Sequence, residues 1–370
     1  MTGSCNTPDN GARPAAAHER KTPSAQRSDV LLRASIGLEN LIQKPENAIP
    51  SAVLNRTKCL VFVPHQVGTR GGAAPGIESC RKKENSWSSP VLLEFTTPQK
   101  RQMDSGDLVV LLDESASEKL LRGELRLGPQ SRAFAGRTTR DMNLATNAEL
   151  SQDIWMYAQQ DGRLVGKSVP GTLVLQSSSE QKPETAFQHI VMESRAGNPT
   201  ARFAAAAISF FNTITPTGII IHHSGIIPTT NELPTDERQV DRFHQKHGFE
   251  TICFGRLYHV AYHFLILPSG EVQVGRPERC QGAHAPGYNS YLGIALIGDF
   301  SSVDNPSGEK GNTKPTTRQM KSLALLCWRI RGRYDIPLQR ILRHSDVSST
   351  LCPGDRFPFT SFLQQLERQQ

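Results

Sequence analysis

The sequence predicts a two-domain protein of the α+β or α/β class, in which a β-rich N-terminal domain precedes a mixed β-sheet flanked by helices. The chain has 370 residues, which is long enough for two domains of ordinary size. In its first half, short apolar runs lie between Gly, Pro and Ser breaks, which is typical of strands. In its second half, such runs alternate with helical patterns, which favours a mixed sheet covered by helices.

The first part of the chain is predicted to contain a polar segment, a helix and several strands. Residues 1–27 lack apolar periodicity and are expected to be disordered. The N-terminal domain is expected at 28–175, beginning with an amphipathic helix that ends at Pro45. Ser115 is predicted to cap a short helix. Strands are predicted at 60–63, 90–95, 107–112, 153–158 and 163–166.

A polar stretch is predicted to separate the two domains. Residues 176–205 are expected to form a linker, and residues 206–370 the second domain. Within the second domain, Thr235 is expected to cap one helix, and Thr316 or Thr317 to open a longer one. Cys327 lies on the apolar stripe of that longer helix, so it is expected to be buried and unpaired.

The net charge and the cysteine content indicate which binding partners and which cellular compartment to expect. A net charge of +7 and a pI of about 9.1 favour anionic partners such as wall polymer or phospholipid. No nucleic-acid-binding motif accompanies the charge, and aromatic residues make up only 6% of the chain, so nucleic acid is not an expected partner. If one of the seven cysteines binds metal, six remain. Six cysteines are compatible with disulfides in an oxidising compartment, although their pairing cannot be deduced.

Candidate zinc ligands occur in the C-terminal half. His222 follows an apolar run and is expected at the end of a buried strand. His344 follows another short apolar run, and Cys352 comes after a Ser/Thr-rich loop that can fold back. Imidazole nitrogen and thiolate sulfur are ligands that zinc prefers. A core histidine beside an unrelated thiol is the alternative. His223 points to the opposite face of the strand from His222, so only one of the two can ligate easily.

Several ordered motifs surround these residues. They are the strand that enters His222 and the segments 240–248, 261–264, 267–273, 282–289, 292–298 and 344–353. Together they resemble the amidase family that includes peptidoglycan recognition proteins and phage-type N-acetylmuramoyl-L-alanine amidases, over about residues 217–362. The resemblance implies the fold of that family for the second domain.

The resemblance also implies the site and its reaction. It implies His222, His344 and Cys352 as zinc ligands, Tyr262 as the catalytic hydroxyl and Thr350 as a polar partner of the reacting water. The reaction implied is zinc-dependent hydrolysis of the amide bond between N-acetylmuramic acid and L-alanine in peptidoglycan. Zinc activates water and polarises carbonyl groups in such sites.

Three further residues are expected near the substrate. His223 is expected to line the site or to support the sheet, and His284 and Asn289 are expected to line the groove. A structural role in the loop is the alternative for His284. Some relatives carry a glutamate where this chain has Ala295, which cannot transfer protons, and this difference favours a mechanism that depends on Tyr262.

The N-terminal domain resembles a different family. Its motifs lie at 49–54, 58–62, 87–90, 107–112, 123–128 and 157–166. They resemble the SYLF domain, also called the Ysc84-type lipid-binding domain, over about residues 30–175, although residues 96–102 depart from its glycine-rich pattern. The resemblance implies binding to anionic phospholipid. The natural contacts would be Arg81, Lys82, Lys83, Lys100 and Arg101, with a solvated loop as the alternative.

Together, these sequence features and resemblances predict a peptidoglycan amidase of the cell envelope, either periplasmic or extracellular. A non-catalytic peptidoglycan-binding module and a membrane-tethering scaffold are the alternatives. The N-terminus lacks the apolar core of a signal peptide, and no apolar run reaches transmembrane length. Because the expected substrate lies outside the inner membrane, we favour an incomplete start of the chain over unconventional export or an intracellular role.

Overall fold

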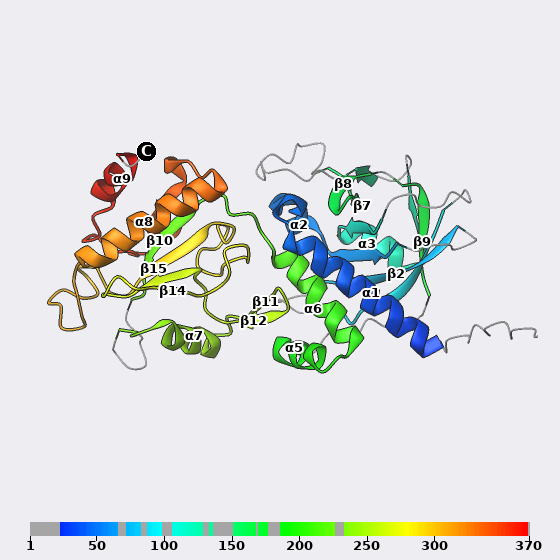
Figure 1. Cartoon of the computed structure of the whole chain (residues 1–370), viewed down its shortest axis with the longest axis horizontal. Coiled ribbons are helices and arrows are strands. Elements are labelled where there is room, and N and C mark those ends of the chain that lie inside the picture. Colours follow the sequence, from blue (N-terminus) through cyan, green and yellow to red (C-terminus); the bar gives the residue numbers. More distant parts are fainter. Residues whose placement is uncertain are drawn as a thin grey trace, which may run out of the picture.

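Two sheets, each with its own helices, lie side by side along the long axis of the molecule (Figure 1). The structure is a computed structural model. It describes residues 23–65, 72–82, 87–97, 106–128, 133–135, 151–167, 169–176, 186–225 and 233–368. Most of the segment 1–27, predicted to be disordered, lies outside these ranges. The first helix begins at Pro23, before the predicted start.

The N-terminal sheet has the strand order β5-β9-β3-β2-β1-β4-β7-β6, with β8 paired to β7. Its pairs are antiparallel except for β6 with β7. The elements are α1 (Pro23–Gln43), η1 (Pro45–Asn47), α2 (Ser51–Arg56), β1 (Cys59–Val63), β2 (Ala73–Cys80), β3 (Val91–Thr96), β4 (Leu108–Leu112), α3 (Glu114–Leu121), β5 (Glu124–Leu127), β6 (Ala133–Ala135), β7 (Ile154–Gln160), β8 (Arg163–Gly166), β9 (Gly171–Leu175), α5 (Phe187–Arg195) and α6 (Pro199–Asn212).

Both faces of this sheet are covered, which explains the continuous apolar runs in its central strands. In β1, Leu60 and Phe62 belong to a core that includes α1 and α6. The alternate residues Val61 and Val63 belong to a second core that includes α3. The side chain of Asp113 caps α3, two residues before the predicted cap Ser115. The prediction of a β-rich domain with helices is confirmed.

The linker predicted at 176–205 is wrong for its second half. Residues 187–195 form α5, and α6 runs from 199 to 212. Asn198 caps α6 through its side chain, and Pro199 follows at the first helical position, where its missing N–H costs nothing. The apolar residues of α6 between Phe203 and Phe211 are buried in the core that contains α1. Burial of this face therefore fixes α6 to the N-terminal domain.

The C-terminal sheet is mixed, as predicted, with the strand order β14-β13-β15-β10-β16. β13, β15, β10 and β16 pair in parallel, and β14 pairs antiparallel to β13. The elements are β10 (Ile219–His223), α7 (Glu237–Lys246), β11 (Thr251–Cys253), β12 (Arg256–Tyr258), β13 (Phe264–Ile266), β14 (Val272–Val274), β15 (Leu292–Leu296), α8 (Thr317–Tyr334), η2 (Leu338–Arg340), β16 (Ile341–Arg343), η3 (His344–Asp346) and α9 (Phe359–Glu367).

Helices cover both faces of the C-terminal sheet. α8 and α9 pack on one face, and α7 packs on the other. Thr316 caps α8 as predicted, and its hydroxyl accepts a hydrogen bond from the N–H of Gln319 at 3.0 Å. α7 is capped by Asp236, whose carboxylate accepts from the N–H of Gln239, one residue after the predicted Thr235. Cys327 is buried in α8 and has a free thiol, as predicted.

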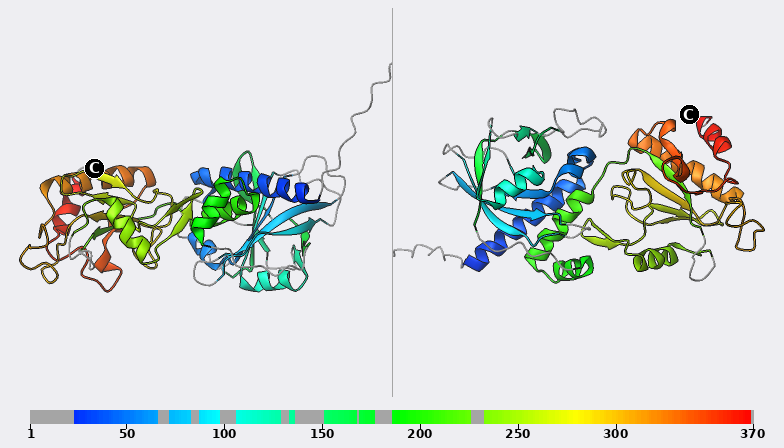
Figure 2. Two further views of the ribbon diagram at one scale, coloured as in Figure 1. Left: turned by 90° about the horizontal axis from the view of Figure 1, so that it is seen from below. Right: turned by 180° about the vertical axis from the view of Figure 1, so that it is seen from behind.

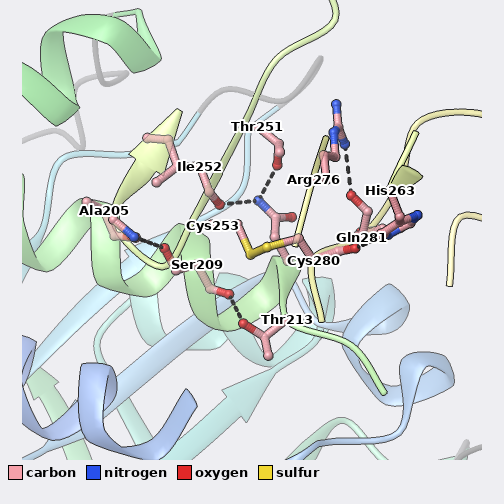
Figure 3. The surroundings of a disulfide bond; sticks show 12 residues. Ala205, Ser209, Thr213, Thr251, Ile252, Cys253, His263, Arg276, Cys280 and Gln281 are labelled. Carbon is pink, nitrogen blue, oxygen red and sulfur yellow. Dashed lines mark hydrogen bonds between the residues drawn. A yellow bond between two sulfur atoms is a disulfide. The ribbon is translucent and has the colours of Figure 1, made fainter. Parts of the chain in front are cut away.

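The two domains meet where α6 packs against β11 and α5 packs against β11 and β12 (Figures 1 and 2). Ile252 of β11 is buried in the core that contains α6. Asn212, at the end of α6, donates its side-chain amide to the hydroxyl of Thr251 at 2.9 Å and to the carbonyl of Ile252 at 3.0 Å. A disulfide joins Cys253 of β11 to Cys280, as Figure 3 shows. A second disulfide joins two neighbouring strands of the N-terminal sheet, Cys59 to Cys80.

Candidate metal centre

Two parallel strands bring a pair of histidines to the same edge of the C-terminal sheet. Ile221 of β10 lies opposite Arg343 of β16. His222 follows Ile221, and His344 follows Arg343, so the strand register places the two histidines next to each other. The centroids of their imidazole rings are 4.4 Å apart.

The loop after His344 folds back and brings a thiol to this edge. The N–H of Ser345 donates to the carbonyl of Cys352 at 2.8 Å, and the N–H of Ser348 donates to the carbonyl of His344 at 3.0 Å. The hydroxyl of Thr350 accepts a hydrogen bond from the N–H of Cys352 at 3.2 Å. Together these bonds fix the backbone on both sides of the thiol.

The three groups form a compact set of metal-ligand atoms. One ligand atom each from His222, His344 and Cys352 lies within 4.8 Å of the others. The distance from Cys352 Sγ to His222 Nδ1 is 3.6 Å. Two ligands on a tetrahedral zinc ion, with bonds of about 2.05 Å to nitrogen and about 2.3 Å to sulfur, are separated by about 3.6 Å. The donor types and this separation therefore fit a zinc ion.

A chain of hydrogen bonds fixes which nitrogen of His222 faces the thiol. His284 Nε2 lies 3.0 Å from the carbonyl oxygen of Tyr291, which can only accept, so Nε2 carries the proton. His284 Nδ1 is then an acceptor, and the N–H of His222 Nε2 donates a hydrogen bond to it at 3.0 Å. His222 Nδ1 is left with its lone pair directed toward Cys352. Proteins commonly orient a metal-binding histidine in this way, by a hydrogen bond from its other ring nitrogen to a neighbouring group.

Burial controls the charge of the ligand groups. The side chain of His222 is 1% exposed, and burial together with the neighbouring His284 and His344 keeps its pKa well below the usual range. His222 is therefore neutral, as a metal ligand must be. Burial raises the pKa of the Cys352 thiol to about 12, although the N–H of His223 donates to its sulfur at 3.3 Å. A cation that binds here must displace the thiol proton.

Tyr262 lies beside the three ligand groups. Its ring centroid is 5.1 Å from that of His222 and 5.5 Å from that of His244. Burial raises the pKa of the Tyr262 phenol above its usual value, and the nearby Cys352 adds to this effect. The phenol therefore keeps its proton at neutral pH and can donate a hydrogen bond next to the cluster.

Comparison with known proteins identifies the family of this domain. The family described as N-acetylmuramoyl-L-alanine amidase matches residues 212–355. The endolysin of Enterobacteria phage T3 is 30% identical over 150 residues, which are 40% of this chain and 87% of the phage protein. The endolysin of Enterobacteria phage K11 is 31% identical over 118 residues, which are 32% of this chain and 68% of the phage protein. The chain belongs to the N-acetylmuramoyl-L-alanine amidase family.

The amidase domain is also similar to an animal protein. Peptidoglycan-recognition protein LB of Drosophila melanogaster is 32% identical over 145 residues, which are 37% of this chain and 54% of that protein. The predicted resemblance to the amidase family is therefore confirmed for the C-terminal domain. The family match begins at residue 212, so it does not extend to the N-terminal domain, whose SYLF resemblance stays a prediction.

His223 lies on the other side of the strand from the ligand atoms of the amidase domain. Its Nδ1 accepts the N–H of Phe300 at 3.1 Å and lies 3.5 Å from a carboxylate oxygen of Asp299. Of the two roles expected for His223, this position corresponds to support of the sheet. Ala295 lies opposite His222 in the sheet and is buried.

His284 and Asn289, predicted to line the groove, lie in one loop of the amidase domain and are joined by a hydrogen bond. The ring of His284 is 6% exposed and both of its nitrogens are hydrogen-bonded, so it has no nitrogen to offer a substrate. Asn289 Oδ1 accepts the N–H groups of His284 and Ala285, each at 3.0 Å. Asn289 therefore holds the loop that carries His284, and its side chain also lines a cavity between the domains.

Of the basic residues predicted to contact lipid, Arg81 and Lys82 lie in the described part of the chain. Lys83, Lys100 and Arg101 lie outside the described residues. Arg81 packs over the rings of Trp87 and Phe211, at 5.8 Å and 4.3 Å from their centroids. Arg81 and Lys82 also line the cavity between the domains. The guanidinium of Arg81 therefore packs on two aromatic rings of the N-terminal domain.

Two buried residues that support the site, His263 and Arg276, were not predicted from the sequence to have a role. His263 Nδ1 accepts the N–H of Gly293 at 2.9 Å, and its Nε2 donates to the carbonyl of Cys280 at 2.7 Å. His263 thereby ties β15 to the segment after β14. Arg276 donates to two backbone carbonyls in the same region. His263 follows Tyr262 directly and precedes an apolar run, which is the signal that could have marked it as a buried polar residue.

Proposed function

We propose that the C-terminal domain is a zinc-dependent amidase that hydrolyses the bond between N-acetylmuramic acid and L-alanine in peptidoglycan. The observation that carries this proposal is the cluster of His222, His344 and Cys352 beside the protonated phenol of Tyr262. Family membership and the phage endolysins among its relatives support the reaction class.

Two histidines and one cysteine would hold the metal. When bound, a zinc ion supplies Lewis-acid polarisation of the amide carbonyl and activation of the attacking water. His284 keeps the proton on Nε2 of His222, so the Nδ1 lone pair stays available. The Thr350 hydroxyl restrains the backbone of Cys352 and so keeps the thiol near His222.

Tyr262 would assist the reaction as a hydrogen-bond donor. Negative charge develops on the carbonyl oxygen when the amide is attacked, and a fixed donor near that oxygen stabilises the transition state. The raised pKa of Tyr262 keeps its proton in place for this role. Ala295, which lies opposite His222, cannot transfer protons, so the role of a polar partner falls to Tyr262 and Thr350.

The proposal includes a location and a hypothesis for the N-terminal domain. A peptidoglycan substrate and two disulfides favour the cell envelope, because disulfides persist in oxidising compartments. None of the helices within the described ranges combines the length and apolar character needed to cross a bilayer. For residues 28–175 we keep the divergent SYLF domain as a hypothesis from sequence resemblance. Its test is flotation of the protein with anionic phospholipid vesicles, and an absence of co-flotation contradicts it.

A non-catalytic peptidoglycan-binding module is the competing hypothesis. Proteins related to this chain include a peptidoglycan-recognition protein, and a recognition module would keep a groove without needing metal ligands. The His222, His344 and Cys352 cluster favours the enzyme, because two imidazoles and one thiol that can share a metal are the three protein ligands that a catalytic zinc site uses.

The test compares two cysteine variants in the release of stem peptide from purified peptidoglycan. Cys352→Ala removes a proposed ligand, whereas Cys327→Ala removes a buried thiol of α8 that lies outside the proposed site. We expect release by the native protein and by Cys327→Ala, loss of release with a chelator, and recovery with added zinc. We expect no release by Cys352→Ala. If the folded, zinc-loaded native protein binds peptidoglycan and releases nothing, the recognition module is the better account.

A further inference from the structure

One loop of the amidase domain contacts both the N-terminal domain and the proposed metal site. This junction loop comprises residues 276–289, between β14 and β15. In its first half, Arg279 and Gln281 donate hydrogen bonds to the N-terminal domain. In its second half, His284 Nδ1 accepts a hydrogen bond from Nε2 of the proposed ligand His222 at 3.0 Å. The junction loop therefore links the interface between the domains to the metal centre.

The ends of two helices hold the first half of the junction loop. Nη1 of Arg279 donates to the carbonyl of Gln43, the last residue of α1, at 2.9 Å. The N–H of Gln281 donates to the carbonyl of Asn212, the last residue of α6, at 2.8 Å. The last carbonyl groups of a helix have no partner within the helix, so they are available to accept these bonds. Because α1 and α6 share one core, both attachments belong to the same rigid part of the N-terminal domain.

Asn212 contacts the amidase domain through its side chain as well as its backbone. Its side-chain amide donates to the hydroxyl of Thr251 at 2.9 Å and to the carbonyl of Ile252 at 3.0 Å, the two dashed lines that end at these residues in Figure 3. These two bonds fix the end of α6 against β11. They therefore also fix the position of the Asn212 carbonyl, which accepts the N–H of Gln281.

The residue between the two attachment points is tied to the sheet that carries the metal site. Cys280 forms a disulfide with Cys253 of β11, and its carbonyl accepts a hydrogen bond from His263 Nε2 at 2.7 Å. His263 Nδ1 in turn accepts the N–H of Gly293, which lies in β15 next to β10. The first half of the junction loop is therefore fixed to the N-terminal domain and to the amidase sheet at the same time.

The second half of the junction loop packs directly on the ring of His284. A Cβ atom added at Gly282 would lie 2.5 Å from this ring, and a Cβ atom added at Gly293 would lie equally close on β15. The imidazole is thus held between two backbone segments with no side chain in between. Asn289 Oδ1 also accepts the N–H of His284 at 3.0 Å. Because Gly282 follows Gln281 directly, a shift of Gln281 displaces the ring that faces His222.

We propose that the N-terminal domain positions the metal centre, because Asn212 and Arg279 fix the junction loop that holds the His284 ring against His222 Nε2. Within the described structure, the side-chain bonds of Asn212 and Arg279 go to the domain interface, so the two are positioning residues. The effect on zinc rests on the proposed function, whereas the position of the two imidazole rings does not. The N-terminal domain thereby acts on the site without contributing a ligand to it.

Variants at the interface are expected to weaken zinc binding although every proposed ligand is kept. Loss of a group that orients a metal ligand costs about 10–100-fold in metal affinity. Asn212 acts on His284 from one step further away, so we expect a loss of about tenfold for Asn212→Ala, the lower end of that range. Arg279→Met removes the donor to Gln43 and should act in the same direction, whereas Arg279→Lys keeps a donor and should restore most of the affinity.

The first experiment is a double-mutant cycle on zinc affinity in the full chain, measured by competition with a coloured chelator. Its four proteins are the native protein, Asn212→Ala, His284→Leu and the double variant. If Asn212 acts through His284, Asn212→Ala has no further effect once His284 is replaced, so the two effects are not additive. The control is Arg202→Gln, which breaks an ion pair with Glu39 inside the N-terminal domain and should leave zinc affinity unchanged.

The second experiment uses the metal-free protein and observes the proton between the two rings directly. His222 is 1% exposed and His284 is 6% exposed, so the proton on His222 Nε2 is shielded from exchange with water. With ¹⁵N-labelled histidine, this proton is followed by NMR in each folded variant. We expect its resonance to move or broaden in Asn212→Ala and in Arg279→Met, and to stay in place in Arg202→Gln.

Three results would overturn the proposal: additive effects in the cycle, zinc affinity that is unchanged in both Asn212→Ala and Arg279→Met, or an unchanged imidazole resonance in both folded variants. Circular dichroism establishes that each variant is folded. The second experiment needs neither zinc nor activity. If the folded native protein binds no zinc while the resonance moves in Asn212→Ala, the positioning role holds and the zinc-dependent amidase is contradicted.

Discussion

His263 makes the stability of the amidase domain depend on pH in a defined direction. Its ring is completely buried, and burial lowers its pKa from the ordinary 6.5 to about 4. Its Nδ1 accepts a hydrogen bond from the N–H of Gly293, and its Nε2 donates one to the carbonyl of Cys280. Only the neutral ring can accept at one nitrogen and donate at the other. The folded state therefore binds the proton of this histidine less readily than the unfolded state does.

The direction and size of the effect follow from these two pKa values. Above pH 6.5 the ring is neutral in both states and the full stability is present. As the pH falls from 6.5 to about 4, the unfolded state binds a proton that the folded state does not bind. The free energy of unfolding therefore decreases over this range. Each pH unit between the two pKa values corresponds to about 1.36 kcal/mol, so the loss approaches roughly 3 kcal/mol.

The assay is urea unfolding followed by circular dichroism at a series of pH values between 4 and 7.5. Other buried groups also titrate, and burial lowers the pKa of His244 to about 4 as well, so the native curve contains more than one contribution. The matched variant is His263→Gln, whose amide offers one acceptor and one donor but does not titrate. We expect its loss of stability over this range to be smaller than that of the native protein by about 3 kcal/mol. Parallel pH curves for the two proteins would refute the reasoning.

Three further predictions test other parts of the structure. His284→Leu removes the acceptor that holds the proton of His222 Nε2, so zinc affinity is expected to fall about 10–100-fold in competition with a coloured chelator, and an unchanged affinity would contradict the orienting role. Tyr262→Phe removes the proposed donor and should lower kcat about 10²–10³-fold with zinc content unchanged, whereas a kcat equal to that of the native enzyme would exclude the role. Replacing both Cys253 and Cys280 by Ala opens a crosslink between residues 27 apart and should cost about 3 kcal/mol in urea unfolding, while no loss would show that other contacts at the domain junction suffice.

The family resemblance, and not the spacing alone, indicated the proposed ligand set, because His222 and Cys352 are 130 residues apart in the chain. His222 and His344 each follow an apolar run that ends at the same edge of one sheet, and Cys352 returns through a short loop. The orientation of the His284 ring could not be predicted from the sequence. Its loop position suggested a groove, but the direction of its ring depends on the carbonyl of Tyr291 and on His222, which only the folded sheet brings together.

The boundary between the two domains was not predicted correctly from the sequence. The polar residues after 176 indicated a linker, but the alanine-rich face of α6 carries Phe203 and Phe211 into the core of the N-terminal domain. Asn198 followed by Pro199 was a recognisable helix start that the composition of the stretch concealed. The disulfide pairs and the cavity between Arg81 and Arg276 depend on residues far apart in the chain, so no local pattern predicts them.

The most direct test of the central claim is the identity of the bond that the protein cleaves. Purified peptidoglycan is incubated with the zinc-loaded protein, and the products are analysed by mass spectrometry after labelling of new amino groups. We predict stem peptides that begin with a free amino group on L-alanine, glycan strands that keep intact N-acetylmuramic acid, and neither product with Cys352→Ala. Cleavage of a glycosidic or a peptide–peptide bond, or the same products from Cys352→Ala, would contradict the account.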